Sequence, residues 1–181
     1  RAADGIGWKD KRGKKQGGNI RRGVGLGVGR HVSASAPSSS VYLRLEMDGS
    51  LHLATSMPDM GTGTTTTLPQ ILSDALGIPL EQVHMTFADT RSAPFDIGGH
   101  STRSLYESGL AILAAAEELK KDIIGYAAAV LGVEPDSLCL EKGSITGGSK
   151  AWPLSELAYY AHQRKKRFES IGRPGFTTTV P

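Results

Sequence analysis

The sequence is poor in the residues that would fix its structure covalently or anchor it in a membrane. It has one cysteine, Cys139, which excludes an internal disulfide and fits a reducing compartment. Cys139 alternates with Leu138 and Leu140, which favours a structural strand residue over a nucleophile. No apolar run approaches the ~20 residues that span a bilayer, and no signal peptide opens the chain. We therefore expect a cytoplasmic protein that does not enter the membrane.

The usual sequence signs of a self-contained active site are also missing. The histidines are scattered and never stand at ligand spacing with cysteine or carboxylates, so we expect no metal site built from this chain alone. There is no Gly-x-Ser-x-Gly elbow and no sign of a Ser/His/Asp or Cys/His arrangement. We predict no catalytic residue here, and we interpret His52 and His84 as ordinary sheet residues.

The net charge of +3 conceals an uneven distribution. The first thirty residues carry nine Lys/Arg against two Asp, and the remaining residues carry twelve basic against sixteen acidic side chains. A second basic cluster lies at 164–167. Basic arms can bind nucleic acid, which is one alternative function, but such binding needs aromatics among the charges. Only Trp8 and Phe168 qualify, so nucleic acid is an unlikely partner. A scaffold segment with no ligand of its own is the other alternative.

We divide the chain into a basic arm or linker (1–22), an α+β domain (23–164) and a tail that continues into further chain (165–181). At the start of the domain, glycines alternate with larger residues from Gly23 to Arg30, which is the period of a strand. This run is not a dinucleotide fingerprint, because Arg30 stands where the third glycine is required.

Residues 41–56 read as a β-hairpin. A three-residue loop at 47–49 places Leu45 opposite Leu51 and Leu43 opposite Leu53, which keeps one apolar face. A two-residue loop would mix the faces. We therefore predict the longer loop, with Gly49 as its left-handed residue.

Two helices dominate the remainder. One ends at Leu76 before Gly77, and Pro69 means that it either begins near Leu68 or is kinked there. The other, over 101–131, has an apolar stripe. A strand at 83–87, a hairpin around 138–145 and a last helix at 155–164 complete the prediction. The fold class expected is α+β, a mixed, largely antiparallel sheet with two main helices packed on one face. The stripe of the second helix consists of Leu105, Gly109, Ile112, Ala116, Leu119, Ile123, Ala127 and Val130.

Two turns suit an anion, one at 61–64 and one at 98–104. Each leads into a predicted helix, whose first amides point outward with partial positive charge, and each carries hydroxyl side chains. In the second turn the Arg103 guanidinium could fork onto two phosphate oxygens. The same residues are also ordinary turn and capping residues, so both readings stay open.

The ordered set of motifs resembles the molybdopterin-binding region of molybdenum hydroxylase large subunits, the xanthine dehydrogenase, aldehyde oxidoreductase and CO dehydrogenase family. Arg21-Arg22-Gly23-Val24-Gly25 resembles the entry strand of that family, and Asp48-Gly49-Ser50 its hairpin tip. Met60-Gly61-Thr62-Gly63-Thr64-Thr65-Thr66-Thr67 is similar to its Met-Gly-Gln-Gly-x-x-Thr loop. Asp89-Thr90, Pro94-Phe95-Asp96-Ile97-Gly98-Gly99 and Ser101-Thr102-Arg103-Ser104 follow in the family order.

This resemblance implies a molybdopterin cofactor with molybdenum, in the cytosine dinucleotide form that is common in bacterial members. It implies an enzyme that hydroxylates aldehydes or N-heterocycles with water, and partners comprising the rest of the large subunit and iron–sulfur and flavin domains or subunits. Thr62 departs from the family glutamine. The family's catalytic glutamate belongs to a later segment, so we expect the isolated fragment to be inactive. We also expect it to self-associate through its strand-like end at 176–181. The cofactor-binding residues implied are Met60, Gly61, Thr62, Gly63, Gly99, Ser101, Thr102, Arg103 and Ser104.

Overall fold

The computed structural model describes residues 1–15, 17–29, 38–147 and 151–173. They belong to two compact units, Arg1–Val32 and Ser33–Pro181. The first unit holds two one-turn helices, α1 (Ala2–Gly5) and α2 (Trp8–Lys11), within the segment predicted as an arm.

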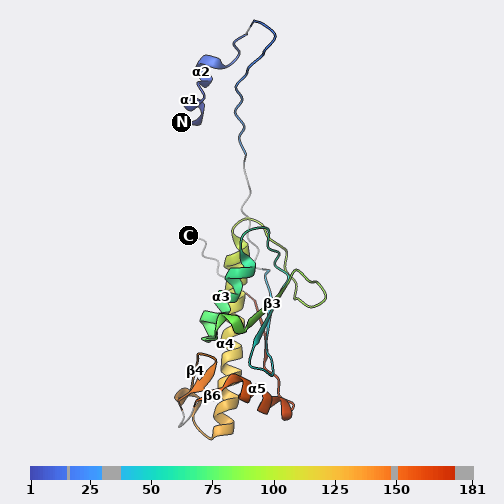
Figure 1. Cartoon of the computed structure of the whole chain (residues 1–181), viewed down its shortest axis with the longest axis vertical. Coiled ribbons are helices and arrows are strands. Elements are labelled where there is room, and N and C mark those ends of the chain that lie inside the picture. The colour runs from blue at the N-terminus through green and yellow to red at the C-terminus, as the bar shows by residue number, and fades with distance from the viewer. Residues whose placement is uncertain (16, 30–37, 148–150, 174–181) are drawn as a thin grey trace. The chain divides into compact units, whose positions relative to one another are not determined.

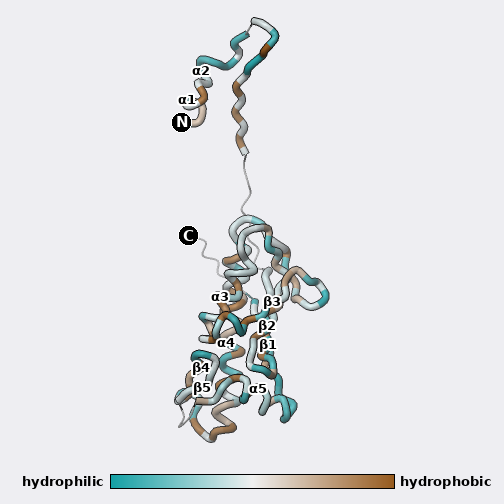
Figure 2. Tube along the Cα trace, in the orientation of Figure 1, coloured by the Kyte–Doolittle hydropathy of each residue, from teal (hydrophilic) through white to brown (hydrophobic). Residues whose placement is uncertain are grey.

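The strand predicted at 23–30 is not formed over 23–29, and Arg30 lies outside the described residues. Glycines and apolar residues do alternate there, as the pale and brown bands of Figure 2 show, but the segment has no strand pairing. Four glycines in seven residues carry a high entropic cost of ordering, and without a partner strand no ladder hydrogen bonds offset it. The alternation alone was therefore a misleading signal.

The main sheet of the second unit has the strand order β3-β2-β1-β7. Its strands are β1 (Val41–Leu45), β2 (Leu51–Thr55), β3 (Val83–Phe87) and β7 (Glu169–Gly172). β1 is antiparallel to β2 and β7, and β2 is parallel to β3. The predicted class, α+β with a mixed and largely antiparallel sheet, is confirmed. Strand β7 comes from the segment predicted as a tail, and the strand-like end at 176–181 lies outside the described residues.

The β1–β2 hairpin has the predicted register. Leu43 pairs with Leu53 and Leu45 with Leu51. The amide of Glu46 donates to the carbonyl of Ser50 at 2.8 Å, which closes the three-residue loop. Gly49 has φ +86°, and a Cβ there would lie 2.6 Å from the amide nitrogen of Ser155, so both backbone conformation and space require glycine.

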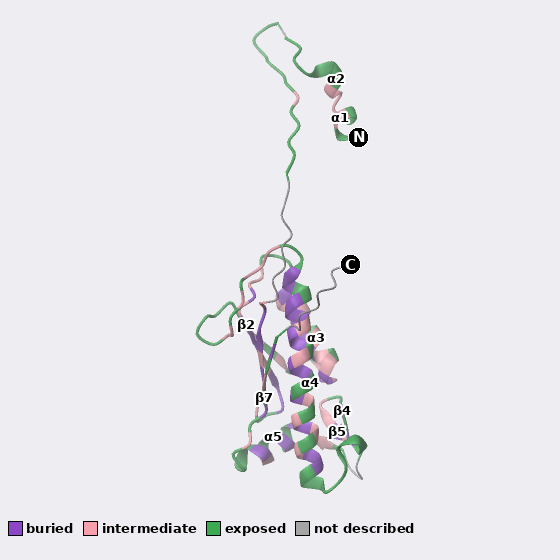
Figure 3. Cartoon of the chain, turned by 180° about the vertical axis from the view of Figure 1, so that it is seen from behind, coloured by how far each residue is buried: buried purple, intermediate pink, exposed green. Residues whose placement is uncertain are grey.

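Helices α3 (Thr64–Leu76) and α4 (Arg103–Leu131) lie on one face of this sheet, as predicted (Figures 1 and 3). Helix α3 begins at Thr64 and includes Pro69, so the alternative start near Leu68 is wrong. Most of the predicted stripe of α4 is buried in the core, including Ile112, Leu119 and Ile123. Its two ends are not, since Leu105 is 45% and Val130 38% exposed.

A smaller sheet, β4-β5-β6, and helix α5 (Leu154–Gln163) complete the unit. The predicted hairpin is confirmed as β4 (Cys139–Glu141) and β5 (Ser144–Thr146), to which β6 (Trp152–Pro153) adds a third strand. Cys139 lies in β4 as predicted, but its side chain is exposed. Across the described part of the chain, no helix is both long enough and apolar enough to cross a bilayer.

Candidate functional site

The turn before α3 is organised by Asp59, a residue that sequence reasoning missed. Its carboxylate accepts hydrogen bonds from the amides of Gly61 at 2.8 Å, Gly63 at 3.2 Å and Thr65 at 3.0 Å, and from the Thr65 hydroxyl at 2.8 Å. It therefore occupies amides at the start of α3 that we expected to be open to an anion. The N-cap preference for aspartate gave no signal for this role, because Asp59 lies four residues before the N-cap Gly63.

These hydrogen bonds have an electrostatic consequence. The amide and hydroxyl of Thr65, with the amides of Gly61 and Gly63, stabilise the ionised carboxylate and hold the pKa of Asp59 well below its ordinary value. The turn thus carries a permanent negative charge at neutral pH. Met60, Gly61 and Thr62, which the resemblance places beside the pterin and metal, are exposed in the loop that Asp59 holds.

The turn before α4 is built differently. Thr102 is the N-cap residue, but its side chain makes no capping hydrogen bond, and Ser101 and Thr102 are exposed. Ser101 has φ +55°, a left-handed conformation that is uncommon for a residue other than glycine, asparagine or aspartate. Such strain persists where the surroundings enforce it, often at ligand-binding segments.

The two predicted cofactor loops lie against each other. A Cβ added to Gly99 would lie 2.7 Å from Cε of Met60 and 3.2 Å from Oγ of Ser104, so the Met60 side chain covers the bare backbone of Gly99. Further along the helices, a Cβ at Gly109 of α4 would lie 3.2 Å from Cδ1 of Ile71 in α3. The helices therefore run side by side in the same direction, and their starts meet at one end of the domain.

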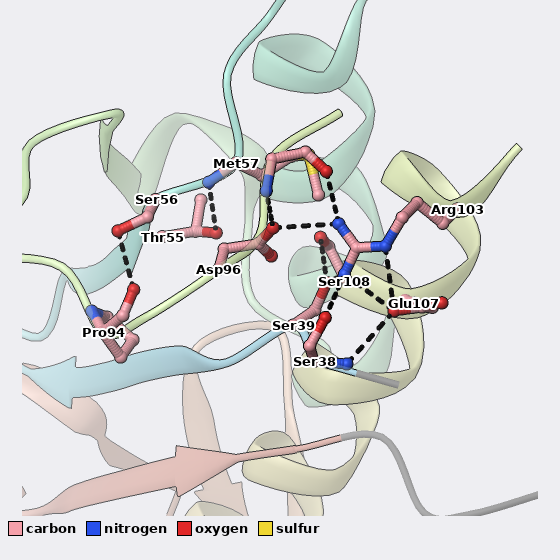
Figure 4. A network of polar contacts seen from close by, with 11 residues as sticks. Ser38, Ser39, Thr55, Ser56, Met57, Pro94, Asp96, Arg103, Glu107 and Ser108 are labelled. Atoms are coloured by element: carbon pink, nitrogen blue, oxygen red, sulfur yellow. Dashed lines mark hydrogen bonds and ion pairs between the residues drawn. The ribbon is translucent and has the colours of Figure 1, made fainter. Parts of the chain in front are cut away.

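The Arg103 side chain lies against the 96–98 segment and is fully buried (Figure 4). Its Nη1 donates to Asp96 Oδ1 at 2.9 Å and to the carbonyl of Gly98. Its Nε and Nη2 donate to Glu107 Oε2 at 3.2 and 2.8 Å, and Nη2 also reaches Ser39 Oγ at 2.9 Å. The prediction that this guanidinium forks onto phosphate oxygens is therefore wrong for this structure, because its donors are directed to acceptors within the chain.

Asp96, Glu107 and Ser39 are further residues that the sequence interpretation did not single out. The side chains of Asp96 and Glu107 are 0% and 3% exposed, and Ser39 is 1% exposed. Burial by itself would lower the pKa of Arg103, but its hydrogen bonds to Asp96 and Glu107 outweigh burial and raise that pKa. One guanidinium faces two carboxylates, so the trio contributes no positive charge to the start of α4. Only the spacing of Arg103 and Glu107, four residues apart, could have suggested a contact.

The residues proposed for nucleic-acid binding are occupied otherwise. Phe168 is 2% exposed and packs edge-on against Tyr126, so no base can stack on it. The Arg12 guanidinium already lies 5.5 Å from the ring centroid of Trp8. Lys166 pairs with Asp122 at 2.7 Å. The two aromatics on which that alternative depended are thus poorly placed for it.

Histidines 52 and 84 are sheet residues, as expected. They are opposite each other in the parallel β2–β3 pair, and His52 Nε2 lies 2.9 Å from Thr86 Oγ1. In the described ranges, no three His, Cys, Asp or Glu side chains gather as potential metal ligands.

Comparison with known proteins identifies this architecture. The family of molybdopterin cofactor-binding domains matches residues 1–179. The chain is 31% identical over 145 residues to a xanthine dehydrogenase molybdenum-binding subunit of Escherichia coli O157:H7, covering 76% of this chain and 19% of that protein. It is 32% identical over 159 residues to an aldehyde oxidoreductase molybdenum-binding subunit of E. coli K12, covering 85% and 21%.

The fold is shared with a solved structure of CO dehydrogenase from Oligotropha carboxidovorans, with a TM-score of 0.68 and 24% identity over 75% of this chain and 18% of that one. The protein is thus a cofactor-binding domain of the molybdopterin class. More specifically, the chain belongs to the molybdenum hydroxylase large-subunit family, and it spans about a fifth of the length of the curated relatives it matches.

Proposed function

We propose that the loops at 58–63 and 98–104 form one wall of the cofactor site in a molybdenum-dependent oxidoreductase. The observation that carries this proposal is the contact of Met60 with Gly99, which joins the two loops that the resemblance assigns to the cofactor. Neither loop is a binding site in itself, but together they present two adjacent helix starts.

The residues present fit a large, polar cofactor. A Cβ at Gly61, Gly63 or Gly98 would meet nothing within 4 Å, so the backbone on that side is open. Thr62, Ser101 and Thr102 are exposed residues whose side chains carry hydroxyl groups. Asp59 occupies amides at the start of α3, so we assign the cofactor's phosphates to the start of α4. There, amides and hydroxyls must hold the phosphates without the Arg103 side chain.

When bound, the cofactor supplies molybdenum, which accepts the electrons of a hydroxylation whose oxygen comes from water. The part of this chain is to bind and orient the pterin. The contact of Met60 with Gly99 sets the spacing of the two loops. Thr62 stands in the sequence where the family has its glutamine. We propose aldehydes or N-heterocycles as substrates, the cytosine dinucleotide form of the cofactor, and electron transfer to iron–sulfur and flavin groups on other domains or subunits. We also assign Ser104, in the first turn of α4, to the cofactor site.

The test is a single methyl group at Gly99 in the full-length protein that carries this chain. In Gly99→Ala the new methyl displaces the flexible end of Met60, which changes the loop contact at little cost to the fold. We expect the molybdenum content and the acid-released nucleotide to fall several-fold. Gly125→Ala is the matched control, since Gly125 is exposed in α4 and a Cβ there meets nothing within 4 Å. Unchanged molybdenum and nucleotide in Gly99→Ala would overturn the proposal, and the released nucleotide identifies the cofactor form.

The isolated 181-residue chain should hold no stoichiometric molybdenum and should be inactive, because it supplies one wall of the site. Metal analysis of the purified chain measures this. One molybdenum per chain would contradict it.

A further inference from the structure

We infer that Arg103 is a positioning residue that sets the shape of the cofactor loop from within, and that it does not bind the cofactor's phosphates. This inference deepens the proposed function and depends on it for the identity of the ligand. The Arg103 side chain joins three segments that are far apart in sequence: the 38–39 segment, the 96–98 loop and the first turn of α4.

The first step is the use of every guanidinium nitrogen. Nε bonds Glu107, Nη1 bonds Asp96 and the Gly98 carbonyl, and Nη2 bonds Glu107 and Ser39. An arginine has five N–H donors in one plane, and the acceptors around its three nitrogens account for all five. The side chain is 0% exposed, so a phosphate would have to break the network to reach it.

The second step is the effect of Arg103 on the loop backbone. Asp96 Oδ1 accepts hydrogen bonds from both Arg103 Nη1 and the Gly98 amide, at 2.9 and 2.7 Å, and Arg103 also donates to the Gly98 carbonyl. The amide and the carbonyl of Gly98 are therefore both held by the Arg103–Asp96 pair. Gly99, which contacts Met60, is the next residue, so the Arg103–Asp96 contact helps to fix the place where the two cofactor loops meet.

The third step is charge. Asp96 Oδ2 is buried without a hydrogen-bond partner, so Asp96 depends on the bonds to its other oxygen. Two buried carboxylates share one guanidinium, and removing that cation would break both buried ion pairs. Lysine cannot replace Arg103, because a single ammonium cannot reach Asp96, Glu107 and Ser39 at once.

Direct phosphate binding and positioning predict opposite results for Asp96→Asn. If Arg103 bound phosphate, neutralising its competitor would free the guanidinium and strengthen retention of the cofactor. If Arg103 positions the loop, the same change weakens the contacts that hold Gly98 and lowers retention of the cofactor. Arg103→Lys keeps a positive charge and should fail in the same way as Asp96→Asn.

The experiment is peptide-level hydrogen exchange on the cofactor-free full-length protein, prepared from cells that do not make molybdopterin. We expect amides 96–102 to exchange at least about tenfold faster in Arg103→Lys and Asp96→Asn, with peptides from 112–127 of α4 unchanged. The matched control is Arg91→Lys, an exposed arginine on the preceding turn, which should leave exchange unchanged. In the cofactor-loaded proteins we expect less molybdenum and nucleotide in both network variants.

Unchanged exchange at 96–102, or higher cofactor content in Asp96→Asn, would overturn the inference. Faster exchange without any change in cofactor content would instead refute the proposed function while leaving the loop-positioning role intact. If Arg103→Lys exchanges rapidly throughout, Ser39→Ala replaces it, since that change removes one acceptor only. A local increase of about threefold at 96–102 then supports the inference, and no increase overturns it.

Discussion

The starts of α3 and α4 are similar in sequence and opposite in construction. Each follows a glycine-containing turn with several hydroxyl residues. At α3 the turn folds around the carboxylate of Asp59, which accepts hydrogen bonds from the amides of Gly61 in the turn and Thr65 in the helix. At α4 the polar groups are buried, Arg103 forms ion pairs with both Asp96 and Glu107, and the Thr102 side chain makes no capping hydrogen bond. The first turn is thus held by a carboxylate of its own segment, and the second is supported by a buried ion-pair network.

The largest effect that we expect is on stability, when the buried network at the start of α4 is removed. Arg103→Met should lower the free energy of unfolding of the 181-residue chain by about 3–5 kcal/mol, because it breaks two buried ion pairs. Urea denaturation measures the change. Arg91→Met, an exposed change, should stay within about 0.5 kcal/mol. A loss in Arg103→Met as small as that of the control would show that the buried network contributes nothing to the fold.

A smaller effect is expected when the closed start of α3 is opened. In the unchanged chain, phosphate at tens of millimolar should shift the amide resonances of residues 99–104 and leave those of 61–65 in place, because Asp59 already occupies the latter. In Asp59→Ala both groups of signals should shift. Shifts at 61–65 in the unchanged chain would mean that phosphate displaces the carboxylate.

The Asp59 cap should also have a defined pH dependence. The pKa of Asp59 is lowered in the folded chain, so its contribution to stability is fully present above the ordinary aspartate pKa of about 4. That contribution is lost as the pH falls through the lower, folded pKa. Amide exchange at 61–65 should therefore keep its protection, relative to Asp59→Ala, down to about pH 4. Loss of that difference between pH 7 and 5 would contradict the assignment.

The smallest effect concerns the metal side of the α3 loop. Thr62 is shorter than the family glutamine by roughly two bonds and would reach the metal's ligands through a bridging water. Thr62→Gln in the full-length protein should keep or modestly raise kcat. A large loss of kcat with unchanged molybdenum content would mean that the pocket is shaped around threonine.

Local sequence patterns predicted the parts of the fold that depend on local periodicity. The alternating leucines of β1 and β2 determined the hairpin register, and the stripe of α4 identified its buried face. Periodicity does not say how far the core extends, so Leu105 and Val130 were wrongly included. Strand β7 has little alternation. It forms because β1 offers an edge and because Gly172 lies so close to α4 that a Cβ would be 1.9 Å from the carbonyl oxygen of Ala111.

The candidate site was predicted only in part for the same reason. The resemblance supplied the loop residues, and the structure brings Met60, Gly99 and Ser104 together, although their binding role remains a prediction. The network around Arg103 joins segments separated by more than sixty residues, and no local pattern encodes such a contact. An arginine in a turn that resembles the family's cofactor-binding loop therefore suggested the wrong partner.

The parallel course of α3 and α4 has a consequence for the balance of charge in the fold. Two neighbouring helices that point the same way place the positive poles of their macrodipoles together, which is unfavourable. The carboxylates of Asp59, Asp96 and Glu107 lie at this shared end, opposite two poles of about half a charge each. With the positive charge of Arg103 included, these side chains carry about two negative charges against about one positive charge from the two poles. They relieve the repulsion before any cofactor arrives, and an anionic cofactor meets no net positive field at this end of the domain. Its specificity must then come from the directions of individual amides and hydroxyls and hardly at all from long-range attraction.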